Sequence, residues 1–384
     1  MCGIVGAIAE RDVVPILMEG LRRLEYRGYD SAGLAIEVAE GGIRRRRTEG
    51  KVQRLQEALD AAALSGRCGI AHTRWATHGV PSERNAHPQV SGDGLALVHN
   101  GIIENHEQLR AELEASGYRF ESETDTEVVA HRIRAHLDDA PELLTAVRRT
   151  VGDLEGAYAL AVMSTDDPEK IVVARAGCPV VIGLGIGENF VASDVAALLP
   201  VTRRFIFLEE GDIARVTRRA VEIWDADGNA VQREEKESVL SADAMERGQY
   251  RHFMQKEIHE QPRAVAETLS ERIGAGKVLE QVFGLDAPAI FDATRAVQIV
   301  ACGTSYHAGM VARYFIEKFA RIPCMVEIAS EYRYRQPVAP DGTLFVAISQ
   351  SGETLDTLEA LRAAKKLGYL ASLGICNVPE SALL

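Results

Sequence analysis

Short apolar runs follow one another closely through roughly the first 230 residues of the chain. They predict strands at 3–9, 32–39, 43–48, 157–163, 171–175, 180–184, 190–194, 205–208 and 212–216, a short strand from Cys68, and another over 95–105 that is interrupted at its polar centre. Apolar residues at helical spacing predict helices over about 13–24, 51–64 and 125–137. Strand-rich sequence with few amphipathic helices indicates two sheets packed together, with helices outside.

The pattern changes in the second part of the chain. A highly charged stretch around 230–250 marks a boundary, and a helical pattern follows over about 252–282. Strands are then predicted at 296–302, 322–328, 344–349 and 369–376, with helices at about 306–319 and 355–366. Strands that alternate with helices indicate a parallel, doubly wound sheet. We expect three parts, at 2–240, 241–283 and 284–384, the last an incomplete domain because the pattern stops partway.

Composition narrows the choice of partners and compartment. The 384 residues carry a formal net charge of −13, which argues against a nucleic-acid or anionic-membrane partner. No apolar run reaches 18 residues and no basic leader precedes an apolar segment, so we expect a cytoplasmic protein. The six cysteines are scattered without a C-x-x-C pair, which is typical of reduced thiols. We therefore expect no metal and no organic cofactor.

Two short motifs have a structural interpretation. The run Arg44-Arg45-Arg46-Arg47 is expected to be a solvated strand or hairpin edge. Gly183-x-Gly185-x-Gly187 lacks the spacing of a nucleotide-binding loop, and no clear helix follows it, so it predicts a hairpin turn.

The candidate nucleophile is Cys2. Once Met1 is removed, this residue carries both a thiol and a free α-amino group, whose ordinary pKa values of about 8.5 and about 7.7–8.0 lie close to neutrality. The amine can then act as the base for its own thiol, with no separate histidine. The competing interpretation is a small buried cysteine in a strand. The position of Cys2 before Gly3 and an apolar strand favours the interpretation as a nucleophile.

A nucleophilic thiol needs hydrogen-bond donors for the developing oxyanion and a clamp for its substrate. Asn100-Gly101 offers an amide NH₂ beside a backbone N–H, although an Asn-Gly pair is equally typical of a hairpin turn. Arg74 is suited to grip a carboxylate, and Asp125 to hold an ammonium group. At the start of a helix Asp125 has the commoner role of favouring the helix dipole. Thr124-x-x-Glu127 fits a capping box at the same helix start. His78 is equally suited to a structural hydrogen bond and to a role in the substrate site.

Two strand-to-helix turns in the second part have the chemistry of a phosphate cradle. One is Ser349-Gln350-Ser351-Gly352-Glu353-Thr354 and the other is Gly303-Thr304-Ser305, each between a buried strand and a helix. Hydroxyls and free N–H groups at a helix N-terminus bind phosphate, although either turn alone is equally explained as helix capping. Two such turns at the carboxyl ends of parallel strands favour a phosphosugar site.

Six stretches of the chain resemble one enzyme family. They are Met1-Cys2-Gly3-Ile4-Val5-Gly6, Tyr26-Arg27-Gly28-Tyr29-Asp30-Ser31-Ala32-Gly33, His72-Thr73-Arg74-Trp75-Ala76-Thr77-His78-Gly79, His99-Asn100-Gly101-Ile102-Ile103-Glu104-Asn105, Thr124-Asp125-Thr126-Glu127 and His252-Phe253-Met254-Gln255-Lys256-Glu257-Ile258-His259-Glu260-Gln261-Pro262. The family is that of the glutamine–fructose-6-phosphate aminotransferases, or glucosamine-6-phosphate synthases. Many amidotransferases share the opening Cys-Gly-Ile, whereas the loop at 74–79 and the stretch at 252–262 are far more restricted. The resemblance covers essentially the whole chain.

The resemblance implies a fold and a reaction. The fold is an N-terminal-nucleophile glutaminase with an α-β-β-α sandwich, an α+β fold, followed by an incomplete α/β doubly wound sugar isomerase domain. Cys2 would attack the side-chain amide of L-glutamine and release ammonia and glutamate through a thioester. In the full-length family member, the ammonia converts fructose-6-phosphate into glucosamine-6-phosphate, and the enzyme is a homodimer.

The resemblance also implies roles for individual residues. It assigns Asn100 and Gly101 to the oxyanion hole, and places Trp75 on a loop that closes over the site and gates ammonia transfer. Those assigned to glutamine are Arg27, Arg74, Thr77, His78 and Asp125. Those assigned to the phosphosugar are Cys302, Gly303, Thr304, Ser305, Ser349, Gln350, Ser351 and Thr354.

The family continues well beyond residue 384, where its residues for ring opening and isomerisation lie, so we expect this chain to be a truncated form with glutaminase activity. We also expect its last parallel strand to have an unpaired edge.

Two other classes of protein compete with this interpretation. One is an amidotransferase of the phosphoribosyl-pyrophosphate or asparagine type, against which residues 349–354 argue. The other is a glutaminase-only fragment or a phosphosugar-binding regulator, and Cys2 and Arg74 argue against a purely binding role.

Overall fold

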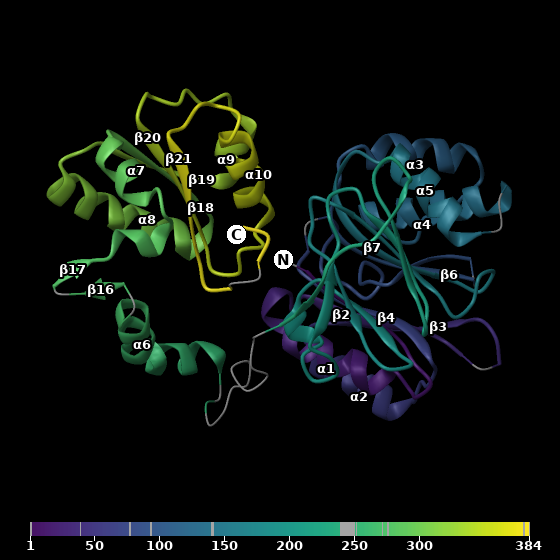
Figure 1. Cartoon of the computed structure of the whole chain (residues 1–384). Helices are drawn as coiled ribbons and strands as arrows, with labels where there is room; N and C mark the ends of the chain where they lie inside the picture. The colour runs from purple at the N-terminus through teal and green to yellow at the C-terminus, as the bar shows by residue number, and fades with distance from the viewer. Residues whose placement is uncertain are drawn as a thin grey trace. The chain divides into compact units, whose positions relative to one another are not determined.

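The computed structural model describes residues 2–38, 40–76, 78–92, 94–139, 142–238, 250, 252–270, 272–274, 276–378 and 381–383 (Figure 1). The chain divides into two compact units, Met1–Met245 and Glu246–Leu384, which we call unit 1 and unit 2. Among the described residues, no helix combines the length and the apolar character needed to span a membrane.

Unit 1 is built on two antiparallel sheets. The first has the order β15-β11-β9-β10-β1-β4-β2-β3 and the second the order β14-β13-β12-β8-β7-β6-β5. The strands of the first sheet are β1 (Gly3–Ile8), β2 (Ser31–Glu37), β3 (Ile43–Glu49), β4 (Cys68–Arg74), β9 (Val181–Leu184), β10 (Asn189–Ala192), β11 (Arg204–Phe207) and β15 (Glu235–Glu237). Those of the second are β5 (Gln89–Ser91), β6 (Leu95–Ile103), β7 (Gly156–Ser164), β8 (Ile171–Ala176), β12 (Ile213–Val216), β13 (Val221–Trp224) and β14 (Ala230–Val231).

Helices cover the outer face of each sheet (Figure 1). They are α1 (Val14–Leu24) and α2 (Val52–Ala61) on the first sheet, and α3 (His106–Ala115), α4 (Asp125–Asp139) and α5 (Leu143–Asp153) on the second. One apolar core joins α1 and α2 to the first sheet, and another joins α4 and α5 to β6, β7 and β8. The predicted two-sheet sandwich with outer helices is therefore confirmed.

The central position of β1 follows from its composition. All six of its residues are buried, and it pairs with β10 on one side and β4 on the other. Gly20 of α1 allows close packing here, since a Cβ at this position would lie 2.9 Å from a methyl carbon of Val5. Residue 2 is thus attached to a fully buried strand in the interior of the sheet.

The predicted interruption of the strand over 95–105 is wrong. β6 pairs with β7 continuously from Leu95 to Ile103, and Asn100 and Gly101 lie inside this ladder. Gly101 has a φ of 128°, and a Cβ there would come within 1.9 Å of the carbonyl oxygen of Ala157. The hairpin-turn interpretation of Asn100-Gly101 is therefore excluded, because glycine here serves a close strand contact.

Other expectations for unit 1 are confirmed with changes. β9 and β10 form the hairpin expected around residues 183–187, where the Gly185 N–H bonds to the Glu188 carbonyl at 2.9 Å. The arginine run lies in β3 at the sheet edge as predicted, but only Arg44 is exposed. Arg47 is partly buried because its guanidinium donates to two loop carbonyls, of residues 84 and 86, at 3.0 Å each. The sequence patterns did not predict α3, α5, β5, β13, β14 or β15.

Unit 2 contains a four-stranded parallel sheet in the order β19-β18-β20-β21. Its strands are β18 (Ala296–Ala301), β19 (Cys324–Ile328), β20 (Thr343–Ser349) and β21 (Ala371–Cys376). Apolar residues of α7 (Ala287–Ala293) and α8 (Gly303–Phe315) pack on one face, and those of α9 (Ala329–Tyr334) and α10 (Leu355–Ala364) on the other. The sheet is doubly wound as predicted, and β21 is one of its two edge strands.

Some elements of unit 2 differ from the predictions. The helix expected over 252–282 ends at Ser270 as α6 (Phe253–Ser270), and a small hairpin of β16 (Ile273–Gly274) and β17 (Lys277–Val278) follows. Helix α8 begins at Gly303 instead of 306, and continues as a π-helical turn over Ile316–Ala320. Neither α7 nor α9 was predicted, because each has fewer than two full turns of periodic sequence.

Candidate active site

The Cys2 thiol lies at the entrance to β1, against the backbone of Trp75. The Trp75 N–H donates to Cys2 Sγ at 3.3 Å, and the thiol lies 3.4 Å from the Trp75 carbonyl oxygen. Burial raises the pKa of the Cys2 thiol, and the Trp75 hydrogen bond and the positive charge of Arg74 oppose this rise in part. The thiol is consequently protonated near neutral pH and needs a base to become a nucleophile.

The stretch 27–31 holds the backbone that contacts this thiol. The Asp30 carboxylate accepts from the Ala76 N–H at 2.8 Å, and the Asp30 N–H donates to the Arg74 carbonyl at 3.1 Å. Gly28 packs directly on the same peptide, since a Cβ there would lie 2.7 Å from the Arg74 carbonyl carbon. Two stretches far apart in the sequence thus form one support for Cys2.

Asn100 reaches Cys2, the candidate nucleophile, from the opposite sheet. Its side-chain amide nitrogen donates to the carbonyl oxygen of Cys2 at 3.2 Å, and its side chain is buried. Gly101 follows it within the same stretch of β6. The structure therefore brings the predicted oxyanion donor Asn100 against residue 2.

Arg74 and Asp125 lie at the ends of two other elements that meet near Cys2. Arg74 ends β4 and is buried; one of its amino groups donates to the His78 carbonyl, and the other, Nη1, is buried with no partner among the described residues. Asp125 begins α4, and its Oδ2 accepts from the Ile103 N–H of β6 at 2.9 Å. The charges of both side chains act on the Cys2 thiol. Arg74 therefore has an unused donor in this region.

The capping box predicted at the start of α4 is only half formed. The Glu127 N–H donates to the Thr124 hydroxyl at 3.3 Å, as expected. The Glu127 carboxylate, however, accepts from the N–H groups of residues 121 and 122, at 2.8 and 2.6 Å, and not from Thr124. The Asp125 carboxylate also accepts a hydrogen bond from Ile103 of β6. Its position therefore depends on a tertiary contact and not on the helix dipole alone.

The remaining predicted glutamine-site residues have different surroundings. The His78 ring packs edge-on against His106, with 5.0 Å between ring centroids. Arg27 is buried and forms an ion pair with Asp194, just after β10. Trp75 as a whole residue is 45% exposed. Thr77 lies outside the described residues.

Asp30 and His72 were not singled out from the sequence. Asp30 supports the peptide beside the thiol, and the His72 Nε2 lies 3.0 Å from Asn100 Oδ1. The only sequence signal for His72 is a polar residue inside an otherwise buried strand, and that signal says nothing about its partner.

Acid is expected to destabilise unit 1 through its buried histidines. Burial lowers the pKa of His72 to about 3, lowers that of His87 well below 6.5, and also lowers that of His99. As the pH falls below 6.5, these histidines become protonated in the unfolded chain but stay neutral in the folded chain. The free energy of unfolding therefore decreases with falling pH, by up to about 1.4 kcal/mol per pH unit for each histidine. Urea unfolding at pH 7.0 and 5.5 measures this, with fluorescence from Trp75 and Trp224, the two tryptophans of the chain, both in unit 1.

The matched variant for this experiment is His87→Gln, which removes one of these three buried histidines. The free energy of unfolding of this variant should therefore depend less steeply on pH. Equal free energies of unfolding at the two pH values would contradict the prediction.

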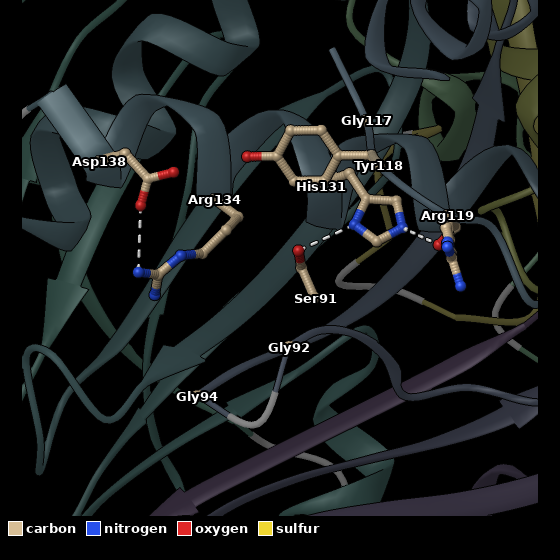
Figure 2. Close-up of a pocket in the computed structure, with 9 residues that line it drawn as sticks. All are labelled: Ser91, Gly92, Gly94, Gly117, Tyr118, Arg119, His131, Arg134 and Asp138. Carbon is tan, nitrogen blue, oxygen red and sulfur yellow. Dashed lines mark hydrogen bonds and ion pairs between the residues drawn. The ribbon is translucent and has the colours of Figure 1, made fainter. Parts of the chain in front are cut away.

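A surface cavity of about 710 Å³ lies elsewhere in unit 1 and contains none of the predicted site residues (Figure 2). Its polar side chains are bonded to their neighbours: His131 lies 2.8 Å from the Ser91 hydroxyl and 3.1 Å from the Arg119 carbonyl, and Arg134 pairs with Asp138 at 3.1 Å. Ser91, His131, Arg134 and Asp138 of the lining are thus bonded to groups of the protein itself.

In unit 2, the turn after β20 is closed by its own hydroxyl groups. Ser349 Oγ accepts from the Gly352 N–H at 3.1 Å, and lies 3.2 Å from the Thr354 hydroxyl. Ser351 Oγ accepts from the Glu353 N–H at 3.1 Å, while Gln350 is exposed. The hydroxyls and N–H groups of a cradle are thus present, and they currently bond to one another.

The second turn of unit 2 lies on the neighbouring strand. Cys302 follows β18, and α8 starts directly after it, with Thr304 exposed and Ser305 partly exposed in its first turn. The Thr357 hydroxyl of α10 lies 4.0 Å from Cys302 Sγ. Since β18 and β20 are adjacent and parallel, both turns lie at the same carboxyl edge of the sheet.

Comparison with known proteins agrees with this arrangement. The glutamine amidotransferase domain family matches residues 72–200, and the SIS domain family matches residues 290–384. The chain is 59% identical over all 384 residues to a glutamine–fructose-6-phosphate aminotransferase (isomerizing) of Pseudomonas syringae pv. tomato, and 58% identical to one of Vibrio vulnificus. This chain belongs to the glutamine–fructose-6-phosphate aminotransferase family.

The length and the fold of these proteins can also be compared. The chain covers 63% of the length of each of the two aminotransferases. A solved glutamine phosphoribosylpyrophosphate amidotransferase from B. subtilis is 18% identical, with a TM-score of 0.53 over 98% of this chain and 81% of that one. At this identity the likeness shows the shared fold alone. The expected glutaminase-type fold followed by part of a sugar isomerase fold is therefore confirmed.

Proposed function

We propose that unit 1 hydrolyses L-glutamine to glutamate and ammonia, and that the complete protein transfers this ammonia to fructose-6-phosphate to form glucosamine-6-phosphate. The proposal is supported above all by the Cys2 thiol, which is held at the Trp75 backbone next to the Asn100 amide. In this proposal residues 2–240 are the glutaminase, 241–283 the connection and 284–384 part of the sugar isomerase domain. The complete protein acts as a cytoplasmic homodimer.

The α-amino group of Cys2 is the base in this reaction. Removal of Met1 frees the amine, which takes the thiol proton as sulfur bonds to the side-chain amide carbon of glutamine. The resulting tetrahedral intermediate loses its nitrogen as ammonia, with the proton returned by the amine, and leaves a thioester. Water then adds to the thioester carbon, and the C–S bond breaks to give glutamate and the thiol. No metal or organic cofactor takes part.

The negative charge of both tetrahedral intermediates needs donors that are already in position. In this proposal they are the Asn100 side-chain amide and the Gly101 N–H. The hydrogen bond from Asn100 to the Cys2 carbonyl, at 3.2 Å, supports this because it keeps the amide close to the reacting residue.

Arg74 and Asp125 bind the two charged groups of the glutamine main chain. The buried, unpartnered Nη1 of Arg74 supports carboxylate binding, because a buried guanidinium donor gains most from a charged acceptor. Asp125 binds the ammonium group with the carboxylate capacity left after its bond to Ile103. Thr77, His78 and Arg27 complete the glutamine site, and the loop with Trp75 covers it and gates the passage of ammonia.

The phosphosugar site is proposed at the two turns of unit 2. The phosphate takes the place of the internal hydrogen bonds of the 349–354 turn, and is bound by Ser349, Gln350, Ser351 and Thr354. Cys302, Gly303, Thr304 and Ser305 line the sugar. This assignment is supported by the position of both turns at the carboxyl edge of adjacent parallel strands.

An assay that separates the two products tests the proposal. The 384-residue chain is incubated with glutamine and fructose-6-phosphate, and glutamate and glucosamine-6-phosphate are quantified separately. We expect glutamate without the amino sugar, because the chain covers 63% of the length of its relatives. Formation of the amino sugar as well would show that this length suffices for synthesis. Absence of glutamate from a folded chain whose Met1 has been removed, as shown by intact mass, would overturn the proposal in favour of a phosphosugar-binding regulator.

A further inference from the structure

His72 lies in β4 with its side chain completely buried, one strand away from the nucleophile. It is paired with Ile4 across the ladder to β1. Its ring points across the sandwich to β6 of the other sheet, where Nε2 lies 3.0 Å from both Asn100 Oδ1 and the His99 carbonyl oxygen. His72 is therefore a direct link between the sheet that carries Cys2 and the residue proposed to bind the oxyanion.

The partners of this ring determine where its proton lies. The Cys2 carbonyl can only accept, so the Asn100 group that bonds to it is the NH₂, and Oδ1 is the group that faces His72. Two acceptors, Asn100 Oδ1 and the His99 carbonyl, thus converge on Nε2, which must carry a hydrogen. Nδ1 is buried with no partner among the described residues, which suits an unprotonated nitrogen.

The surroundings also keep the ring neutral. Burial lowers the pKa of His72 to about 3; the Arg74 charge acts in the same direction, and the hydrogen bonds to Asn100 Oδ1 and the His99 carbonyl oppose it. A charged ring would leave a second N–H buried without an acceptor. Near neutral pH the ring is consequently a neutral donor of fixed orientation.

We infer that His72 is a positioning residue of the proposed glutaminase site, which holds the Asn100 amide with its NH₂ toward Cys2. The inference rests on the proposed function. An amide rotated by half a turn would present its oxygen to the developing oxyanion and repel it. His72 disfavours that rotation because Nε2–H would then face the NH₂ and both donors would lose their acceptors. His72 therefore acts on the reaction through Asn100, without touching glutamine.

The kinetic test compares two substitutions of this ring. His72→Leu removes the donor and should lower kcat by about tenfold or more. This loss should be smaller than the roughly 10²–10³-fold loss expected when an oxyanion donor itself is removed. The KM for glutamine should stay unchanged because the His72 ring bonds to Asn100 and to the His99 carbonyl, and among the described residues it makes no hydrogen bond to the proposed clamp residues Arg74 and Asp125. His72→Gln keeps an N–H donor and should recover most of kcat. His131→Leu is the matched control, since His131 is also buried in unit 1 and bonds elsewhere.

A double-mutant cycle separates positioning from a general structural effect. In an Asn100→Ala background, His72→Leu should cause no further loss of kcat, because the side chain that it orients is gone. Alkylation of Cys2 by iodoacetamide, which forms no oxyanion, should proceed at the wild-type rate in every variant. An undiminished kcat in His72→Leu, or losses that multiply in the double variant, would overturn the inference.

One measurement needs no destabilising variant. Nitrogen NMR of histidine-labelled wild-type chain at pH 7 should show His72 as a neutral ring protonated at Nε2, with its signal assigned by its loss in His72→Gln. A ring protonated at Nδ1, or a charged ring, would overturn the inference even if His72→Leu does not fold. If the wild-type chain releases no glutamate, the proposed function fails instead, and the two failures are thus distinguished.

Discussion

Replacing Cys2 with alanine is expected to abolish glutamine hydrolysis, with a loss on the order of 10⁴-fold or more. The thioester cannot form without sulfur, and the structure offers no second thiol at the Trp75 backbone among the described residues. The side chain is only partly buried, so the substitution should leave the fold intact. Glutamate release under saturating glutamine measures the effect.

The matched control for this experiment is Cys68→Ala. Cys68 is a buried thiol in the same unit, where burial raises its pKa well above 9.0. Its substitution should cost some stability and leave kcat near the wild-type value. Hydrolysis by Cys2→Ala at a rate close to that of Cys68→Ala would disprove the assignment of Cys2 as the nucleophile.

Asn100→Ala is expected to lower kcat by roughly 10²–10³-fold while leaving the KM for glutamine nearly unchanged. In the proposed mechanism the Asn100 amide stabilises a negative charge that exists only in the tetrahedral intermediates, so its loss should affect the transition state and not the bound substrate. Arg74→Ala provides the contrasting result. It removes a group proposed to hold the carboxylate before and during reaction, so KM should rise more than kcat falls.

The hydrogen bond from Asn100 to the Cys2 carbonyl makes one further comparison necessary. If this bond mainly positions the nucleophile, Asn100→Ala should slow the alkylation of Cys2 by iodoacetamide as much as it slows hydrolysis. We expect alkylation to be unchanged. A rise in KM with kcat preserved would rule out the oxyanion role, and unchanged glutamine affinity in Arg74→Ala would rule out the clamp.

Much of the fold could be predicted because long, regular apolar patterns are local. The buried strand at the N-terminus, the helix over α1 and the strand–helix alternation of unit 2 were all predicted near their observed bounds. Short or polar elements such as α7, α9 and β15 could not be, because their few residues carry no clear period. The strand break predicted at Asn100-Gly101 is absent from β6, because these turn-forming residue types here serve a close contact with β7.

The amino-acid pattern alone was enough to identify the candidate nucleophile, the amide and arginine proposed to assist it, and the order of the two units. Only the tertiary structure showed that Trp75, 73 residues from Cys2, supplies the backbone groups around its sulfur, and that Asp30 supports them. The contact of His72 with Asn100 likewise became apparent only when two sheets were packed face to face. The physical reason is that periodicity records which side of a strand is buried, whereas the partner of a buried polar group depends on how distant strands are aligned.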